Sequence, residues 1–198
     1  PTLHSLFNSN HNIIAVITNQ DKKSGRGKTY TSTSIKQYSL DNNINLIEAE
    51  DINNLDFQDK IKTTKPDLII VIAFRLLPAK IFNIPSYGTM NLHASLLPKY
   101  RGAAPIQRAI INGDSETGIS TFFIDENIDT GNLILQRKVV INELDNFISL
   151  HDKLSKIGSE LVMDSIDYIF LKKPLIKQKG DPSYAKKIKK NELQIDWS

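Results

Sequence analysis

The sequence predicts an α/β protein in which helices flank a doubly wound, mostly parallel β-sheet. Short runs of apolar, largely β-branched residues recur along the chain, and such runs are typical of strands buried on both faces. Segments with apolar residues at helical spacing lie between these runs, which is the order of parallel βαβ units. The chain has no fixed-period self-similarity, so a repeat architecture is excluded.

The expected strands differ in pattern. The buried runs are residues 13–17 (IIAVI), 68–73 (LIIVIA) and 89–93 (TMNLH). Residues 117–124 and 133–141 alternate more in polarity, which favours an antiparallel or mixed edge of the sheet.

Helices are expected at residues 34–42, 55–64, 104–112 and 149–171. The last is well defined, because Leu150, Leu154 and Leu161 recur at helical spacing. Pro1 resembles a helix start, where proline is favoured. A doubly wound domain normally has a strand before such a helix, and residues 194–197 resemble the beginning of a further element. We therefore expect both ends to be cut.

Composition excludes several kinds of protein. The chain has 198 residues, which suits one large domain, and no apolar run approaches the ~20 residues of a membrane span. It opens without signal-peptide features. It has no cysteine, which excludes disulfides, thiolate zinc sites and a cysteine nucleophile and fits a reducing cytosol. The net charge of +3 does not by itself indicate a nucleic-acid partner, although basic residues gather at 22–28 and 172–190.

Candidate catalytic side chains are concentrated at residues 91–105 (NLHASLLPKYRGAAP). Asn91 and His93 are two positions apart on a predicted strand, so their side chains share a face near the end where open sheets bind ligands. An amide donor beside an imidazole can stabilise an oxyanion and transfer a proton, as acyl transfer requires. The alternative is a histidine that hydrogen-bonds within the core, and spacing alone favours neither.

Two further segments are candidates for function. Asp129, in the loop 125–131 (DENIDTG), can orient and stabilise a charged imidazole, or it can simply cap a tight turn. The loop at residues 19–28 carries four cations, Lys22, Lys23, Arg26 and Lys28. Its Gly-Arg-Gly matches no phosphate-binding loop, but a mobile loop of this charge can hold a nucleic-acid backbone. The alternative is a solvated charged loop.

Residues 91–98 (NLHASLLP) together with Asp129 resemble the Asn–His–Asp signature of the folate-dependent formyltransferases. That family includes glycinamide ribonucleotide and nucleotide-sugar formyltransferases. Residues 101–110 (RGAAPIQRAI), 20–28 and 194–198 (QIDWS) resemble its methionyl-tRNA formyltransferase branch. The resemblance covers nearly the whole chain, with the motifs in the family's order. One departure is Asn19-Gln20-Asp21, where the family usually has Gln-Pro-Asp.

The resemblance implies a Rossmann-like formyltransferase fold that lacks its first strand. Residues 1–183 would form the catalytic domain, and residues 184–198 would begin the linker to an absent C-terminal β-barrel. The implied formyl donor is 10-formyltetrahydrofolate, and the acceptor is the α-amine of methionine on charged initiator tRNA. An amino-sugar nucleotide is the alternative acceptor. No metal and no membrane partner are implied, and we expect a cytoplasmic monomer.

The resemblance also implies roles for individual residues. Asn91 would donate to the formyl oxygen, His93 would stabilise the tetrahedral intermediate and transfer a proton, and Asp129 would orient His93 and help to deprotonate the amine. The folate pocket would be lined by Ser95, Leu96, Leu97 and Pro98, with the Leu97–Pro98 peptide bond cis. The tRNA-binding residues would be Arg26, Lys22, Lys23 and Lys28.

Two alternatives belong to other functional classes. Ser95 as an acyl-enzyme nucleophile is one, although its surroundings do not resemble a nucleophile elbow. The other is a folate- or RNA-binding module in which Asn91, His93 and Asp129 are only structural.

Overall fold

The computed structural model describes residues 1–24 and 29–194. Its helices are α1 (Thr2–Phe7), α2 (Ser34–Asp41), α3 (Leu55–Thr64), α4 (Ala79–Phe82), α5 (Pro105–Ile111) and α6 (Phe147–Phe170), followed by the 3₁₀ turn η1 (Lys190–Leu193). Its strands are β1 (Val16–Asn19), β2 (Lys22–Ser24), β3 (Thr29–Thr31), β4 (Leu46–Ala49), β5 (Ile69–Ile72), β6 (Thr89–His93), β7 (Glu116–Phe123) and β8 (Leu133–Val140).

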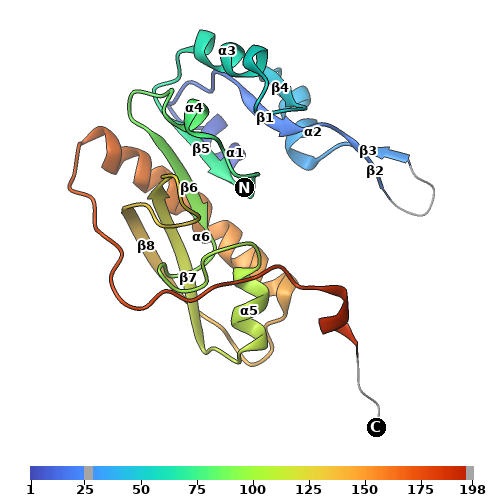
Figure 1. The fold of residues 1–198 in the computed structure, drawn as a ribbon, viewed down its shortest axis with the longest axis vertical. Helices are drawn as coiled ribbons and strands as arrows, with labels where there is room; N and C mark the ends of the chain where they lie inside the picture. The colour runs from blue at the N-terminus through green and yellow to red at the C-terminus, as the bar shows by residue number, and fades with distance from the viewer. Residues whose placement is uncertain (25–28, 195–198) are drawn as a thin grey trace.

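Parallel strands form the first part of the fold and antiparallel strands form the far edge (Figure 1). β1 pairs in parallel with β4, and β5 pairs in parallel with β6. β6 then pairs antiparallel with β7, and β7 with β8, in the order β5-β6-β7-β8. The expected α/β class is confirmed, and so is the antiparallel edge expected from residues 117–124 and 133–141.

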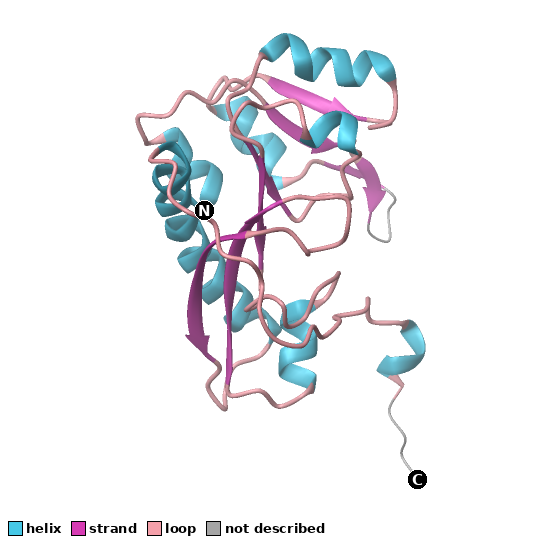
Figure 2. Cartoon of the chain, turned by 60° about the vertical axis from the view of Figure 1, so that its left-hand side comes forward, coloured by secondary structure: helices cyan, strands magenta, loops and turns pink. Residues whose placement is uncertain are grey.

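Helix α6 covers one face of the four-stranded sheet (Figures 1 and 2). Met90 and Leu92 of β6 belong to the apolar cluster that contains Val162 and Ile166 of α6. Because side chains alternate along a strand, Asn91 and His93 point to the opposite face. The packing of α6 therefore leaves this polar pair on the face that carries the loops after β6 and β7.

The first turn of α6 corrects the expected start at residue 149. The side chain of Asn146 accepts hydrogen bonds from the backbone N–H groups of Ile148 and Ser149, at 2.9 and 3.1 Å. The Ser149 hydroxyl in turn accepts from the Asn146 N–H at 3.0 Å. This reciprocal cap satisfies the otherwise free amides of the first turn, so the helix begins at Phe147.

The N-terminal strands also differ from the prediction. β1 starts at Val16 instead of residue 13, because its pairing with β4 starts there and the Val16 N–H donates to the Asn45 carbonyl at 2.8 Å. β4 and α4 were not predicted. Each has only four residues, which is too short for a periodic pattern to stand out.

The segment predicted as a mobile basic loop contains a hairpin. β2 pairs antiparallel with β3, in the register Lys22↔Thr31 and Ser24↔Thr29. At its base, Asp21 accepts from Lys36 Nζ at 2.8 Å and from the Ser32 hydroxyl at 3.1 Å. The hydrogen bond from Lys36 holds the pKa of Asp21 below its usual range. Asp21, the acidic residue of this segment, is therefore ion-paired with Lys36 of α2.

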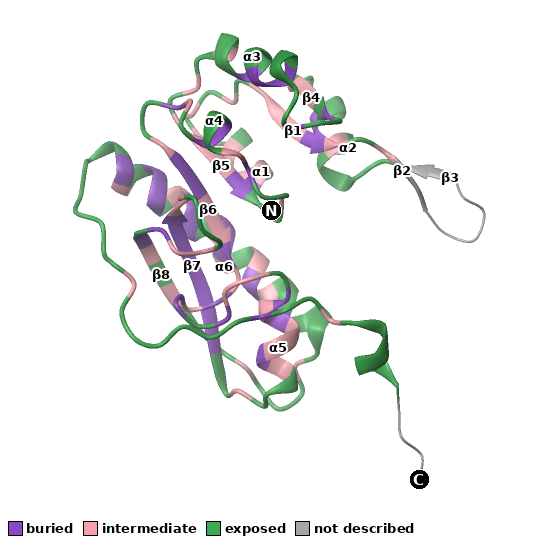
Figure 3. Cartoon of the chain, viewed as in Figure 1, coloured by how far each residue is buried: buried purple, intermediate pink, exposed green. Residues whose placement is uncertain are grey.

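Burial is greatest in the middle of the four-stranded sheet, where β6 and β7 are covered along most of their length (Figure 3). A second apolar cluster, containing Phe57, Ile61 and Ile81, joins α3 and α4 to the strands beside them. Across the part of the chain that the structure describes, no helix has the combination of length and apolar character needed to cross a bilayer.

Candidate active site

His93 lies at the end of β6 and is 7% exposed. Its Nε2 is 2.8 Å from the carbonyl oxygen of Tyr100. A carbonyl only accepts hydrogen bonds, so Nε2 carries the hydrogen, and Nδ1 is the basic nitrogen of the neutral ring. Nδ1 lies 3.7 Å from Oδ2 of Asp129. The nitrogen that is able to take up a proton therefore faces a carboxylate.

Asp129 reaches His93 from the loop between β7 and β8. Its backbone is in the left-handed region (φ 56°), a conformation that costs free energy and is held by surrounding contacts. Its Oδ2 accepts from the N–H of Gly102 at 2.7 Å. Capping of the turn is done by Asp125, which accepts from the Thr130 hydroxyl at 2.6 Å. The Asp129 carboxylate is thus turned toward His93.

Gly131 is required beside Asp129 for steric reasons. A Cβ at this position would lie 1.7 Å from the Phe123 carbonyl oxygen. The Thr-Gly that follows Asp129 therefore allows the loop to fold closely against the end of β7.

Asn91 is partly buried on the same face of β6 as His93. Its backbone is paired opposite Phe122 of β7. Among the described residues, no group makes a hydrogen bond to its side-chain amide, so the N–H donors are available to a ligand. An uncommitted amide next to a buried imidazole is able to stabilise charge that develops on an oxygen.

The loop after β6 is hydrogen-bonded to Ser120, which is fully buried in β7. Ser120 Oγ accepts from the Leu97 N–H at 3.0 Å and donates to the Ser95 carbonyl at 2.6 Å. The side chain of Gln136 donates to Ser120 Oγ at 2.8 Å and to the Leu97 carbonyl at 2.9 Å. The Leu97–Pro98 peptide bond is cis, as expected.

The side chains of this loop have different surroundings. Leu97 is buried against Phe122 and Leu133. Ser95 is fully buried, and its hydroxyl donates to the Lys99 carbonyl at 2.5 Å. Ser95 therefore closes its own turn, which counts against the alternative of an acyl-enzyme nucleophile.

Tyr100 connects the loop to α5. Its hydroxyl donates to Asp114 Oδ2 at 2.6 Å and accepts from the Asn112 amide at 2.8 Å. Burial raises the pKa of the Tyr100 phenol, and the neighbouring Asp114 raises it further. With the ring fixed and the backbone at φ 58°, the Tyr100 carbonyl is directed at His93.

The predicted tRNA-binding residues are only partly described. Lys22 and Lys23 belong to β2, in the hairpin that extends beyond α2 (Figure 1). Arg26 and Lys28 lie outside the described residues. The structure therefore describes the backbone on both sides of residues 25–28, in β2 and β3.

Two surface hollows lie away from the three candidate catalytic residues. One of about 780 Å³ is lined by residues of α3 and α4 and of the segments that follow each of these helices, including Lys62, Lys65 and Lys80. A second, of about 180 Å³, lies beside Leu96 and Tyr100 and is smaller than typical ligand pockets of roughly 300–1,000 Å³. Neither hollow includes Asn91, His93 or Asp129, so the candidate site is defined by the side chains of these three residues. In the ranges 1–24 and 29–194, no cluster of three His, Cys, Asp or Glu side chains is arranged to hold a metal ion.

Sequence reasoning missed several residues that shape the site. Ser120 does not stand out in a strand that also contains Thr117 and Thr121, and the Tyr100 carbonyl is a main-chain group. Gln178, which bonds the Asp129 loop, lies in a lysine-rich segment that showed no relevant pattern. Of these three residues, Ser120 is the one that the sequence could have indicated, as a serine within a strand predicted to be part of the sheet.

Comparison with known proteins identifies the class. The sequence model described as formyl transferase matches residues 2–166, so the chain belongs to the formyl transferase family. The chain is 44% identical to the methionyl-tRNA formyltransferase of Bacteroides thetaiotaomicron, over 99% of this chain and 63% of that protein. It is 42% identical to the methionyl-tRNA formyltransferase of Thermodesulfovibrio yellowstonii, over 100% of this chain and 65% of that protein. The chain thus spans just under two thirds of the length of these relatives.

Solved structures share the fold. An N-formyltransferase from Helicobacter canadensis, in complex with folinic acid and dTDP-3-aminofucose, is 26% identical with a TM-score of 0.72, over 98% of this chain and 67% of that chain. HypX from Aquifex aeolicus, in complex with tetrahydrofolic acid, is 17% identical with a TM-score of 0.67, over 80% of this chain and 28% of that chain. The Rossmann-like formyltransferase fold expected from the sequence is confirmed.

Proposed function

We propose that the protein transfers the formyl group of 10-formyltetrahydrofolate to the α-amine of methionine on charged initiator tRNA. The observation that carries the proposal is the pairing of His93 with Asp129 on the face of β6 that also presents Asn91. The identity of 40–44% with several methionyl-tRNA formyltransferases supports this acceptor.

The reaction makes one bond and breaks another. The acceptor nitrogen forms a bond to the formyl carbon and loses a proton, and the bond from that carbon to the donor's nitrogen breaks as that nitrogen gains a proton. The Asn91 amide donates to the formyl oxygen as negative charge builds there. The proton from the amine goes to His93 Nδ1, since Nε2 already carries a hydrogen that is donated to the Tyr100 carbonyl. Asp129 stabilises the imidazolium that results.

We propose that a folate-derived donor binds at the loop after β6. The neighbours from Helicobacter canadensis and Aquifex aeolicus contain folinic acid and tetrahydrofolic acid, which supports the same class of donor here. Residues 95–98 lie directly after His93, where Ser95, Leu97 and Pro98 are buried and Leu96 is partly buried. We therefore propose that this loop lines the donor pocket mainly through its main chain, together with the partly exposed side chain of Leu96.

The acceptor distinguishes the proposal from its alternative. The Helicobacter canadensis neighbour is crystallised with an amino-sugar nucleotide, so this acceptor belongs to the same fold. We propose that the β2–β3 hairpin, with Lys22, Lys23, Arg26 and Lys28, contacts the phosphates of tRNA. A transferase for a small amino sugar does not need such a basic extension.

Formyl transfer by the full-length protein tests the proposal. The protein is supplied with 10-formyltetrahydrofolate labelled in the formyl group, and with either charged initiator tRNA or a dTDP-amino sugar. We expect label in the tRNA. Label in the sugar nucleotide alone would establish the alternative enzyme, whereas folate binding without transfer to either acceptor would indicate a binding module.

Other expectations stay predictions. They are the division of the chain into residues 1–183 and 184–198, a monomeric state, and action in the cytoplasm, where initiator tRNA is used. Contacts cross the proposed division: Ala185, just beyond it, is fully buried and donates from its N–H to the Arg101 carbonyl at 2.7 Å, and Arg108 forms an ion pair with Glu192 at 2.8 Å.

A further inference from the structure

Gln178 makes side-chain hydrogen bonds to both loops that form the site. Its Oε1 accepts from Nη2 and Nε of Arg101, at 2.6 and 3.2 Å. Its Nε2 donates to the carbonyls of Asp129 and Gly131, both at 2.9 Å. Arg101 follows the loop after β6, and Asp129 belongs to the loop after β7. One amide therefore joins the two loops that contact His93, one through the Tyr100 carbonyl and the other through the Asp129 carboxylate.

The orientation of this amide follows from its partners. A guanidinium only donates and a carbonyl only accepts, so the Gln178 oxygen faces Arg101 and the nitrogen faces the two carbonyls. These contacts close a ring of hydrogen bonds, because the Asp129 carboxylate accepts from the N–H of Gly102, the neighbour of Arg101. Glutamine suits this position because it combines one acceptor with two donors.

The segment that carries Gln178 is fastened on both sides of it. Ile176 exchanges two backbone hydrogen bonds with Leu133, at 2.8 and 3.0 Å. Further on, the Arg101 N–H donates to the Ser183 carbonyl at 2.9 Å. Between these anchors the segment is largely exposed (Figure 3), and Gln178 is more buried than its neighbours on either side. The one side chain turned inward here is the one that contacts the site.

The backbone of Asp129 needs such support. It is held in the left-handed region, and its carboxylate must stay turned toward Nδ1 of His93. A shift of about 1 Å in a reacting group is enough to cost roughly 100-fold in rate. The two donors of Gln178 restrain the main chain on both sides of Thr130, which fixes the direction of the Asp129 side chain.

We infer that Gln178 is a positioning residue that holds the Asp129 loop against the Arg101 loop, so that the Asp129 carboxylate stays directed at His93. This inference rests on the proposed role of that pair in formyl transfer. Gln178 itself acts through Asp129 and not on the reacting atoms.

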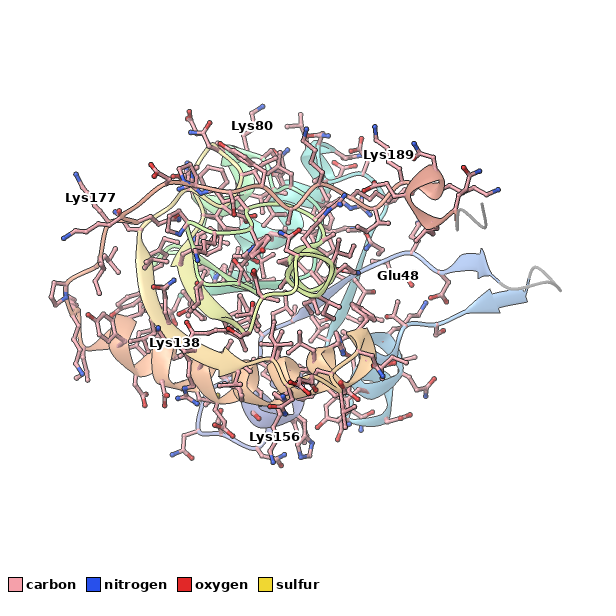
Figure 4. All side chains as sticks on the ribbon, turned by 90° about the horizontal axis from the view of Figure 1, so that it is seen from below. Glu48, Lys80, Lys138, Lys156, Lys177 and Lys189 are labelled. Atoms are coloured by element: carbon pink, nitrogen blue, oxygen red, sulfur yellow. The ribbon has the colours of Figure 1, made fainter. Side chains whose placement is uncertain are left out.

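Kinetics of the full-length protein test the role. We expect Gln178→Ala to lower kcat roughly 10- to 100-fold, with the KM for 10-formyltetrahydrofolate little changed. Gln178→Glu keeps an acceptor for Arg101 but turns a carboxylate oxygen toward the two carbonyls, so it should lose at least as much. Lys177→Ala is the matched control, because Lys177 is the exposed neighbour and points away from the protein (Figure 4). Its kcat should equal that of the unchanged protein.

A double variant separates positioning from a general structural role. If Gln178 acts through Asp129, then Gln178→Ala should cost little further in an Asp129→Ala background. Losses that multiply in the double variant, or an unchanged kcat in Gln178→Ala, would overturn the inference.

Amide hydrogen exchange gives a readout that does not depend on the reaction. The Gly102 N–H is bonded to the Asp129 carboxylate, so its exchange reports the position of that side chain. Gln178→Ala should speed Gly102 exchange by up to about tenfold, toward the rate in Asp129→Ala, while amides in β6 and β7 keep their protection. Unchanged Gly102 exchange, or uniform acceleration across the sheet, would contradict positioning. A protein that formylates neither acceptor but shows the local Gly102 effect would refute the proposed function and leave the role of Gln178 intact.

Discussion

The Asp129 carboxylate lies 3.7 Å from Nδ1 of His93, while the other nitrogen of that ring is committed to the Tyr100 carbonyl. The distance is too long for a direct hydrogen bond. While the ring is neutral, Nδ1 of His93 and Oδ2 of Asp129 are both hydrogen-bond acceptors. The pair becomes favourable once Nδ1 takes up a proton. The arrangement therefore suits a base that is neutral before the reaction and charged during it.

Loss of this base should remove most formyl transfer. We expect His93→Ala to lower kcat about 10²- to 10³-fold while the protein stays folded, and Asn91→Ala to be similarly severe, because each removes a group that stabilises the transition state. The measurement is kcat with charged initiator tRNA, together with thermal unfolding. His151→Ala is the control, because His151 is exposed on α6, where it bonds Asp152 and lies beside the Phe147 ring, away from His93. Near-normal turnover in His93→Ala would refute the assignment.

Ser120 should matter for both stability and donor binding. Ser120→Ala leaves the buried Leu97 N–H and Ser95 carbonyl without their partner, which costs about 1–3 kcal/mol in the free energy of unfolding. Because these groups shape the loop after β6, the KM for 10-formyltetrahydrofolate should rise as well.

Urea unfolding and donor saturation kinetics measure the two effects of Ser120→Ala. Ser159→Ala is the matched control, because Ser159 is also buried but its hydroxyl bonds the Lys156 carbonyl of its own helix. A fall in stability without a change in KM would show that the loop does not form the donor pocket.

Stability should depend on the ionisation of Asp145. The hydrogen bond from Lys153, aided by those from the Asn142 N–H and the Ser149 hydroxyl, lowers the pKa of Asp145 from 3.8 to about 2. A carboxyl whose pKa is lower in the folded state stabilises the protein above about pH 4, and this contribution is lost as the pH falls toward 2.

The Asp145→Asn variant checks that sign. It should be less stable than the unchanged protein at pH 7, and the difference in the free energy of unfolding should shrink as the pH is lowered below 4. Urea unfolding at a series of pH values measures it. Asp152→Asn, which removes an exposed carboxylate from α6, is the control. A difference that stays constant with pH would contradict the role of the charge.

Arg26 should act on tRNA and not on the folate donor. A guanidinium can bind a phosphate with two hydrogen bonds, so Arg26→Ala should raise the KM for charged tRNA. The salt dependence of tRNA binding should also decrease, by the amount expected for the loss of about one phosphate contact. Donor affinity should be unchanged. Lys156→Ala removes one positive charge that points outward from α6 and serves as the control (Figure 4). An equal loss of donor affinity in Arg26→Ala would place the segment in the folate pocket instead.

Long or strongly patterned segments were predictable from the sequence. Helix α3 has the expected bounds, 55–64, and β6 has the expected bounds, 89–93. The parallel pair β1–β4 was predicted less well: β1 starts three residues later than expected, and β4 was not predicted; each has only four residues. The β2–β3 hairpin was missed, since glycines and cations around Arg26 suggested a loop and not a paired ribbon.

The sequence by itself determined that Asn91 and His93 share one face of a strand, because side chains alternate with a period of two. It also determined that Asp129 lies in a tight loop, through the Thr-Gly that follows it. Only the tertiary structure decided what holds these residues in place. The hydrogen bond from Gln178 to Asp129 spans 49 residues, and the one from Arg101 to Gln178 spans 77. Periodic patterns record which face a residue occupies on its own element, whereas such distant partners are set by how the elements pack together.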